Sequence, residues 1–146
     1  METVYRFREL TEDDRPGILN IARQLGYAAS EQTVSDLVDL VLKKENHQMV
    51  IADNGKHLLG YIHLIFNDTN ESAVRVDIAG ILIPDDFRGK GIGTAFIKEA
   101  EKWSRGRDVK SMSIRRNLIR NEAIPFFSHH GFKTDLSGET LTKKLI

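Results

Sequence analysis

The sequence predicts a single mixed α+β domain over residues 1–146, and three observations lead to this class. Stretches in which apolar and charged residues alternate occur together with stretches of 3.6-residue apolar spacing, so both strands and helices are expected. Two apolar runs flank Asp53-Asn54-Gly55-Lys56, which is a strong hairpin signal. No linker, repeat or low-complexity tract divides the chain.

The first third of the chain predicts one strand followed by two helices. Residues 4–10 alternate apolar and charged side chains, as in a half-exposed strand. Thr11 offers an N-cap for a helix that carries an apolar stripe and ends at Gly26. A second helix is expected to start at Ser30, because apolar residues follow at 3.6 spacing as far as Leu42.

The remainder of the chain predicts strands interspersed with two further helices. Strands are expected at 49–52 and 58–66, around the hairpin signal, and at 73–83, after a polar loop at 67–72. The later expected elements are a helix at 91–105, a strand at 109–114, a helix at 121–130 and a strand at 140–145.

Composition excludes several classes of function. The 21 basic residues equal the 21 acidic ones, and this balance argues against a general nucleic-acid binder, which needs an excess of cations. Cysteine is absent, which excludes disulfides, thiolate nucleophiles and Cys-based metal sites. His129 and His130 lack neighbouring ligands of other types, so no metal is expected. No signal-peptide core or membrane-length apolar run occurs, so we expect a cytoplasmic protein without a membrane partner.

A glycine-rich turn is the strongest functional signal in the chain. Arg88-Gly89-Lys90-Gly91-Ile92-Gly93 follows the apolar run 78–84 and precedes the expected helix at 91–105. Such a turn aims several backbone N–H groups, together with the positive end of the helix dipole, at one point. The turn is therefore suited to hold a phosphate group.

Two motifs resemble those of one enzyme family. The turn at 88–93 fits the pattern Arg/Gln-x-x-Gly-x-Gly/Ala, and residues 120–132 contain an Arg or Asn, then an Ala, an aromatic pair and Gly-Phe. The chain thus resembles the GNAT superfamily of acyl-CoA-dependent N-acyltransferases. The segments 25–27 and 60–63 are most similar to the bacterial group that includes the aminoglycoside 6'-N-acetyltransferases.

The resemblance implies a mixed, mostly antiparallel central sheet flanked by helices, in the order β-α-α-β-β-β-α-β-α-β. It implies acetyl-CoA as co-substrate, an amine acceptor as partner and no metal, and it leaves a homodimer open. The pantetheine arm would pair with the strand end, and the pyrophosphate would lie on the turn. The implied contacts are Ile81, Leu82, Ile83, Arg88, Gly89, Lys90, Gly91, Ile92, Gly93, Thr94 and Phe127.

Candidate catalytic groups lie in the strands before the turn. Gly80 inside a strand pattern indicates either a bulge, which would free an N–H such as that of Ile81 to polarise the thioester carbonyl, or simply close packing. If the strands around 63 and 77 form a hairpin, His63 falls almost opposite Asp77, and the two can accept a proton together. The alternatives are a structural pair or a surface contact between Arg75 and Asp77.

The second motif departs from the family in two ways. Phe127 occupies the position where many members have a tyrosine, so water, Ser128 or His129 would have to protonate the leaving thiolate. Pro125 belongs in a first helical turn, so the last helix is expected to start near Ile124 rather than at 121. That would leave Asn117 and Asn121 in a loop beside the cofactor, or as ordinary turn residues.

The sequence favours an N-acetyltransferase in which a small-molecule amine attacks the thioester directly. A protein or peptide amine acetyltransferase and a low-turnover acyl-CoA-binding sensor are the alternatives. Acidic residues in the two-helix segment would favour a polycationic acceptor, although a solvated acidic helix face explains them equally well. These residues are Glu12, Asp13, Asp14, Glu31, Asp36 and Asp39.

Overall fold

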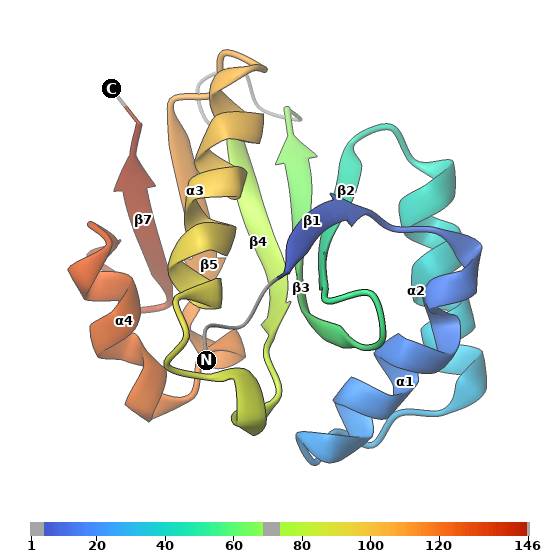
Figure 1. Ribbon diagram of the computed structural model, residues 1–146. Coiled ribbons are helices and arrows are strands. Elements are labelled where there is room, and N and C mark those ends of the chain that lie inside the picture. The colour runs from blue at the N-terminus through green and yellow to red at the C-terminus, as the bar shows by residue number, and fades with distance from the viewer. Residues whose placement is uncertain (1–4, 69–73, 146) are drawn as a thin grey trace.

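A seven-stranded sheet runs through the protein in the order β1-β2-β3-β4-β5-β7-β6 (Figure 1). The computed structural model describes residues 5–68 and 74–145. The strands are β1 (Arg6–Glu9), β2 (His47–Asp53), β3 (Leu58–Asn67), β4 (Arg75–Leu82), β5 (Ser111–Arg115), β6 (Lys133–Thr134) and β7 (Thr140–Lys144). All neighbours pair antiparallel except β4 and β5, which are parallel.

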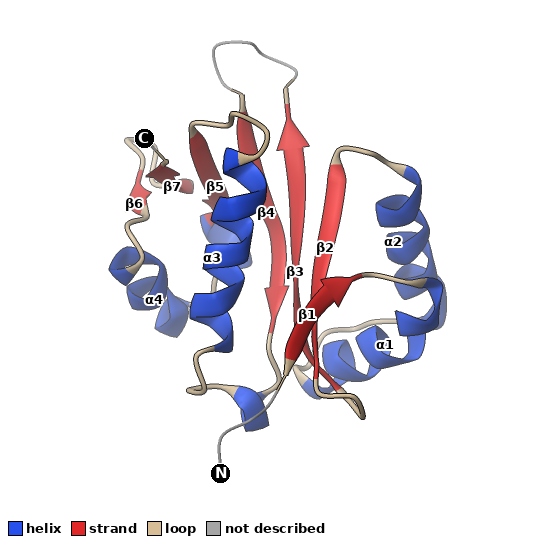
Figure 2. Cartoon of the chain, turned by 45° about the horizontal axis from the view of Figure 1, so that its top comes forward, coloured by secondary structure: helices blue, strands red, loops and turns tan. Residues whose placement is uncertain are grey.

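Helices pack against both faces of the sheet. They are α1 (Arg15–Gln24), α2 (Glu31–Lys43), α3 (Ile92–Arg105) and α4 (Ile124–His129). In Figure 2, α3 lies across β4 and β5, while α1 and α2 lie beside β2. None of the described helices combines the length and apolarity needed to cross a bilayer.

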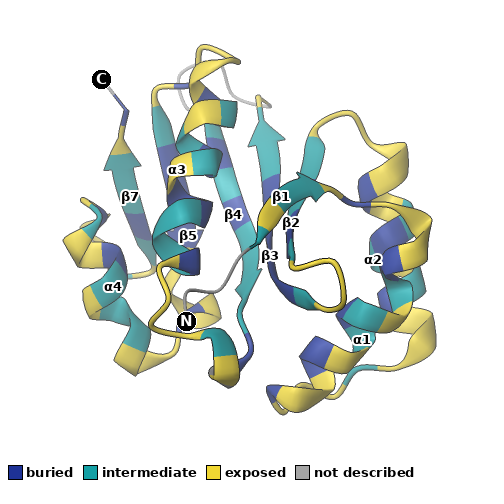
Figure 3. Ribbon diagram, viewed as in Figure 1, coloured by how far each residue is buried: buried dark blue, intermediate teal, exposed yellow. Residues whose placement is uncertain are grey.

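The core consists of two clusters on opposite faces of the sheet. Helices α3 and α4 cover the larger cluster, in which Phe96 and Phe127 pack against Ile62 and Ile78. Helices α1 and α2 cover the smaller one, in which Ile18 and Val38 pack against Met49, Ile51 and Tyr61. Figure 3 shows the buried positions of these helices turned toward the sheet. Alternate residues of β2 and β3 thus enter different clusters, as a strand with two covered faces requires.

Most expected elements are present, with shifted boundaries. Ser30 caps α2 by accepting the N–H of Thr33 at 3.1 Å. The first helix begins later than expected: a 3-10 turn at Glu12–Asp14 precedes α1, which starts beside Pro16. Strand β6 was not expected from the sequence. The expected loop residues 69–72, the start of the strand at 73 and residue 4 lie outside the described residues.

Strand β4 has two irregularities that prepare a site. Its register against β3 shifts between the pairs His63↔Gly80 and Leu64↔Ile78, so Ala79 is an extra residue. Of the two alternatives left open for Gly80, the structure thus shows the bulge. On its other side, β4 pairs with β5 only from Val76 to Ile78, and beyond Ile78 no described strand continues that pairing. The two parallel strands therefore separate beside the bulge.

Candidate functional site

The glycine turn lies at the start of α3 and has the backbone that its sequence demands. Gly89 and Gly91 have φ angles of 75° and 81°, a region that L residues with a Cβ avoid. Gly91 is the N-cap of α3, and the first helical hydrogen bond runs from the N–H of Ala95 to its carbonyl at 3.0 Å. The N–H groups of the preceding helical residues therefore have no partner within the helix. A Cβ on either glycine would project into open space.

The third glycine of the turn serves a different purpose. A Cβ on Gly93 would lie 3.1 Å from the ring of Phe126. Gly93 therefore allows α4 to pack closely on α3, in addition to lying on the wall of the cleft. Thr94, the next residue, has its Oγ1 3.1 Å from Nε2 of His130, which links α3 to the C-cap of α4.

A cleft of about 480 Å³ extends from this turn along the end of β4. Most of the residues expected to contact the cofactor line it: Ile81, Leu82, Ile83, Arg88, Gly89, Gly91, Ile92, Gly93, Thr94 and Phe127. Arg88 turns back toward the strand and donates from Nε to the carbonyl of Ile83 at 3.2 Å. Lys90, Asn117 and Asn121 are exposed and are not part of the lining.

The second motif contributes other residues than the expected asparagines. Helix α4 begins at Ile124, as Pro125 indicated, but the preceding segment brings Leu118, Arg120 and Glu122 to the cleft. Arg120 Nη2 donates to the carbonyl of Leu25 at 2.8 Å and so ties this segment to the end of α1. Leu25 and Tyr27 line the cleft from that side. The motif pattern, in which an Arg or Asn precedes an Ala, already contained Arg120.

The expected pairing of His63 with Asp77 is wrong. The two strands start from the pair Asn67↔Arg75, later in β4 than the expected loop at 67–72 implied, and the extra residue Ala79 then moves the partner of His63 one residue further. His63 pairs with Gly80, and Asp77 pairs with Ile65. Asp77 accepts hydrogen bonds from Arg75 Nε at 2.7 Å and from Asn67 Nδ2 at 3.3 Å, which is the surface contact named as an alternative. Neither His63 nor Asp77 is among the described residues that line the cleft.

His63 instead contacts a second histidine. Its Nε2 lies 2.9 Å from Nδ1 of His47, which comes from β2. The His63 side chain is only 6 % exposed, and burial, followed by the charge of His47, lowers its pKa to about 4. Burial and Lys44 also lower the pKa of His47. Both imidazoles are therefore neutral at neutral pH.

Phe127 is buried on the wall of the cleft. It packs edge-on against Phe126 and Phe132, with ring centroids 5.2 and 5.5 Å apart. A phenyl ring has no proton to donate, so this position supplies the cleft with apolar surface alone.

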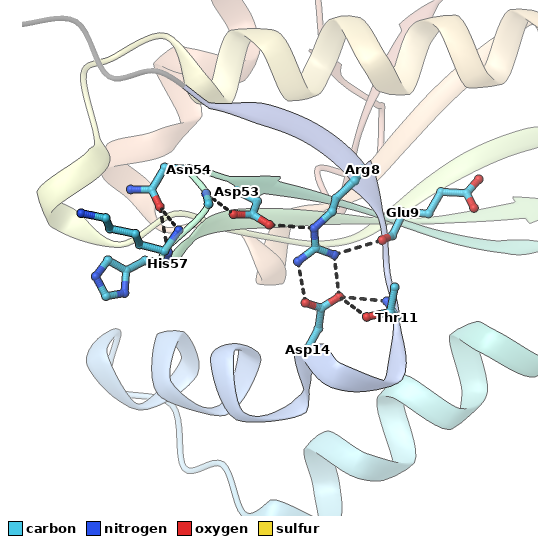
Figure 4. Close-up of polar contacts among 9 residues, drawn as sticks. Arg8, Glu9, Thr11, Asp14, Asp53, Asn54 and His57 are labelled. Carbon is cyan, nitrogen blue, oxygen red and sulfur yellow. Dashed lines mark hydrogen bonds and ion pairs between the residues drawn. The ribbon is translucent and has the colours of Figure 1, made fainter.

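The acidic residues of the two-helix segment do not surround this cleft. Asp13 and Asp14 line a separate cavity of about 490 Å³, where Arg8 binds Asp14 and Asp53 (Figure 4). Asp39 forms an ion pair with Arg15 at 2.6 Å. Among the described residues, Glu122 is the single carboxylate on the wall of the cleft at the end of β4.

The cleft matches the chemistry of coenzyme A. The residues at its glycine end present backbone N–H groups suited to a pyrophosphate, and the edge of β4 is open for an extended arm. Its apolar wall suits the pantetheine chain. These features define a coenzyme A-binding transferase of α+β architecture.

The chain belongs to the acetyltransferase (GNAT) family, whose sequence profile matches residues 5–132. It is an acetyl-CoA-dependent acetyltransferase by this membership. No curated protein sequence matches the chain significantly.

Solved structures with the same fold differ widely in sequence. A GNAT-family acetyltransferase from Desulfovibrio desulfuricans superposes with a TM-score of 0.80 at 15% identity, over 98% of this chain and 100% of that one. An aminoglycoside 6'-N-acetyltransferase in complex with coenzyme A gives 0.77 at 13% identity, over 97% of both chains. The ribosomal-protein-S18-alanine N-acetyltransferase from Escherichia coli gives 0.75 at 13%, over 97% of this chain and 94% of that one.

Proposed function

We propose that this protein transfers the acetyl group of acetyl-CoA to the primary amine of a small molecule by direct attack on the thioester. The observation that carries this proposal is the separation of β4 from β5 at a bulge, with the glycine turn at the end of the same strand. The strand edge can orient an extended thioester while the turn holds its phosphates. Bound acetyl-CoA supplies the activated acyl group.

The residues of the bulge would stabilise the charge that develops on the thioester oxygen. Ala79 is the extra residue in the pairing with β3, and on the side of β5 no described strand pairs with β4 beyond Ile78. A backbone N–H near Gly80 or Ile81 that points to this open side would be available to the thioester. A fixed backbone N–H beside a developing oxyanion is an effective source of stabilisation. The amine nitrogen forms a bond to the acetyl carbon as the carbon–sulfur bond breaks.

Proton transfer remains assigned to His63, with Asp77 as the second candidate. His63 pairs with Gly80 and lies next to His47, so a proton taken from the amine through water could pass on to His47. Its pKa of about 4 makes His63 a weak base that is unprotonated at neutral pH. If His63 serves as the base, the acidic limb of the pH–rate profile due to this group lies near pH 4.

We favour a small-molecule acceptor over a protein amine because of a bond across one side of the cleft. The bond from Arg120 to Leu25 joins the end of α1 to the segment before α4, and we expect this bridge to hinder a polypeptide more than a small amine. Among the fold neighbours, one enzyme is named for an aminoglycoside acceptor and another for an alanine of a ribosomal protein. The fold itself therefore permits both classes.

A low-turnover acyl-CoA sensor is the second candidate function, and Phe127 is the observation that favours it. The phenyl ring offers no proton to the leaving thiolate. The proposal for an enzyme needs none, because a coenzyme A thiol resembles a free cysteine thiol, whose pKa near 8.5 makes the thiolate an adequate leaving group that water can protonate.

The test measures release of the coenzyme A thiol from acetyl-CoA over a panel of amines, with the acetylated product identified by mass spectrometry. Release that depends on an added small amine supports the enzyme. Tight binding of acetyl-CoA without release on any amine or peptide overturns it in favour of the sensor.

Variants test the individual sites. Arg88→Ala and Gly91→Asp should weaken binding of coenzyme A in calorimetry; unchanged affinity in both would contradict the phosphate site. Asp77→Asn and His63→Ala test the base, and pH–rate profiles unchanged in both variants remove the pair.

A further inference from the structure

We propose that the acceptor is a monoamine carried on an apolar body, aromatic or branched aliphatic, which lies between Tyr27 and Leu118. This inference rests on the proposed function, because it concerns the acceptor of the same cleft. It is carried by the position of these two side chains on the wall of the cleft, by their exposure and by the charges around them.

Tyr27 lines the cleft from the side of α1, opposite the strands where the thioester is expected. The ring of Tyr61 comes 3.9 Å from the point where a Cβ on Gly80 would be, so Tyr61 lies at the bulge. Tyr61 also pairs with Leu82, which lines the cleft. Tyr27 follows Leu25 just after α1, and both line the same cleft from the side of that helix.

Leu118 approaches the cleft from β5. It lies in a 3-10 turn, Arg116–Leu118, directly after β5 ends at Arg115. Because β5 leaves β4 after the pair Ile78↔Ile114, a residue just beyond β5 lies at the mouth of the gap between the strands. Both Tyr27 and Leu118 line the cleft.

These two side chains leave apolar surface open to a ligand. In the described part of the chain, five large apolar side chains are exposed, and Tyr27 at 49 % and Leu118 at 48 % are two of them. They come from segments far apart in sequence, yet they flank one cleft. An exposed apolar pair at the rim of a binding site is a feature of ligand recognition, whereas a single exposed leucine needs no explanation.

The charges of the lining do not suit a polycation. Arg88, Arg120 and Glu122 are its charged residues within the described chain. Arg88 lies at the glycine turn, and Arg120 and Glu122 both lie in the segment before α4. A body with several ammonium groups would meet two guanidinium groups and one carboxylate on this wall, so a single amine on a neutral body is the better match.

The experiment compares amines of different bodies at the same acetyl-CoA concentration. 2-Phenylethylamine and isoamylamine represent the proposed class, and spermidine, kanamycin and a short peptide with a free N-terminal amine represent the others. We expect kcat/KM for one of the two apolar amines to exceed that for every other amine by about tenfold or more. A polyamine, aminoglycoside or peptide that equals or exceeds them overturns the inference while leaving the acetyltransferase function intact.

Variants locate the effect at the two side chains. Tyr27→Ala and Leu118→Ala should each raise KM for the preferred apolar amine by roughly tenfold, with little change in kcat or in the affinity for coenzyme A. Tyr27→Phe should have a KM close to that of the wild type, because the ring contact remains.

Leu42→Ala is the matched control, since Leu42 is 44 % exposed on α2 and lines neither cavity. Equal effects of Leu42→Ala and Leu118→Ala would contradict the assignment, and transfer to no amine at all would overturn this inference and the proposed function together.

Discussion

Arg8 shows how one residue connects three elements. From β1 it donates two hydrogen bonds to Asp14, just before α1, at 2.7 and 2.9 Å, and one to Asp53 at the end of β2 at 2.8 Å. Asp14 is 5 % exposed and also accepts the N–H of Thr11 at 2.8 Å. Burial works to raise the pKa of Asp14, but the bonds from Arg8 and Thr11 outweigh it and lower the pKa. The bond from Arg8 is the largest cause that lowers the pKa of Asp53.

Replacing Arg8 should destabilise the protein strongly. Arg8→Met leaves Asp14 buried without its cation, and we expect a loss of about 3 kcal/mol in the free energy of unfolding at pH 7. The control is Arg15→Met, whose partner Asp39 is 45 % exposed and whose loss should cost under about 1 kcal/mol. Because the carboxyl pKa values are lowered in the folded protein, this contribution is present above about pH 4 and disappears as the pH falls through the folded values. Equal losses in the two variants, measured by urea denaturation, would contradict this account.

His63 should make stability depend on pH in the weakly acidic range. Its folded pKa of about 4 is below the unfolded value near 6.5, so between these values the unfolded chain binds more protons. The free energy of unfolding therefore keeps the full contribution of His63 above about pH 6.5 and decreases as the pH falls toward 4. The expected decrease between pH 7 and pH 5 is up to about 2 kcal/mol. His63→Gln should flatten this dependence, and His57→Gln, at an exposed turn, should not. Denaturation curves of the wild type and of both variants at pH 7 and pH 5 test this prediction. An equal pH dependence in the wild type and in His63→Gln would contradict it.

At the scale of elements, local signals predicted what local chemistry determines. The glycine turn, the Ser30 cap and the start of α4 at Ile124 follow from residue types at fixed offsets. The register of β3 against β4 did not follow, because the strands start from the pair Asn67↔Arg75 rather than at the ends of the expected loop, and one extra residue at Ala79 then moves every pair beyond it. Strand β6 has two residues and no periodicity to detect, and it exists through its pairing with β7.

The candidate site was likewise predictable where its residues are continuous in sequence and not where distant segments meet. Ten of the expected cofactor contacts line the cleft, because the turn and the strand end are continuous in sequence. The residues from the α1 end and the segment before α4 were missed as contacts, since only the tertiary bond between Arg120 and Leu25 brings those segments together.

A pair of glycine variants can separate the role of the turn in binding coenzyme A from the effect of backbone strain on stability. Gly91 and Gly55 have φ angles of 81° and 91°, and a Cβ on either would meet no atom within 4 Å. Gly91→Ala and Gly55→Ala should therefore cost similar stability, about 1 kcal/mol each. Only Gly91→Ala should also weaken binding of coenzyme A, because its methyl group would enter the space of the pyrophosphate. Calorimetric affinities that fall equally in both variants would show that the effect is strain alone.

On the scale of the whole molecule, a ligand in the cleft bridges both halves of the core. The cleft is lined by Leu82, which packs in the cluster under α1 and α2, and by Phe127, which packs in the cluster under α3. Coenzyme A at 100 times its Kd should stabilise the fold by about 2.7 kcal/mol, which raises Tm by roughly 5–10 °C. Gly91→Asp should abolish most of this shift. A wild-type Tm that coenzyme A leaves unchanged would contradict binding at this site.

The separation of β4 from β5 also has a consequence for the protein before it meets its co-substrate. A strand edge that opens in the middle of a sheet is a template on which a segment of another polypeptide can add, with the risk of aggregation. The chain limits that template to a few residues: the bulge at Ala79 breaks its regularity, and Pro84, which has no N–H, follows the strand end. Binding of acetyl-CoA in the gap between β4 and β5 would thus protect newly folded chains from pairing with one another, and it would also prepare them for catalysis.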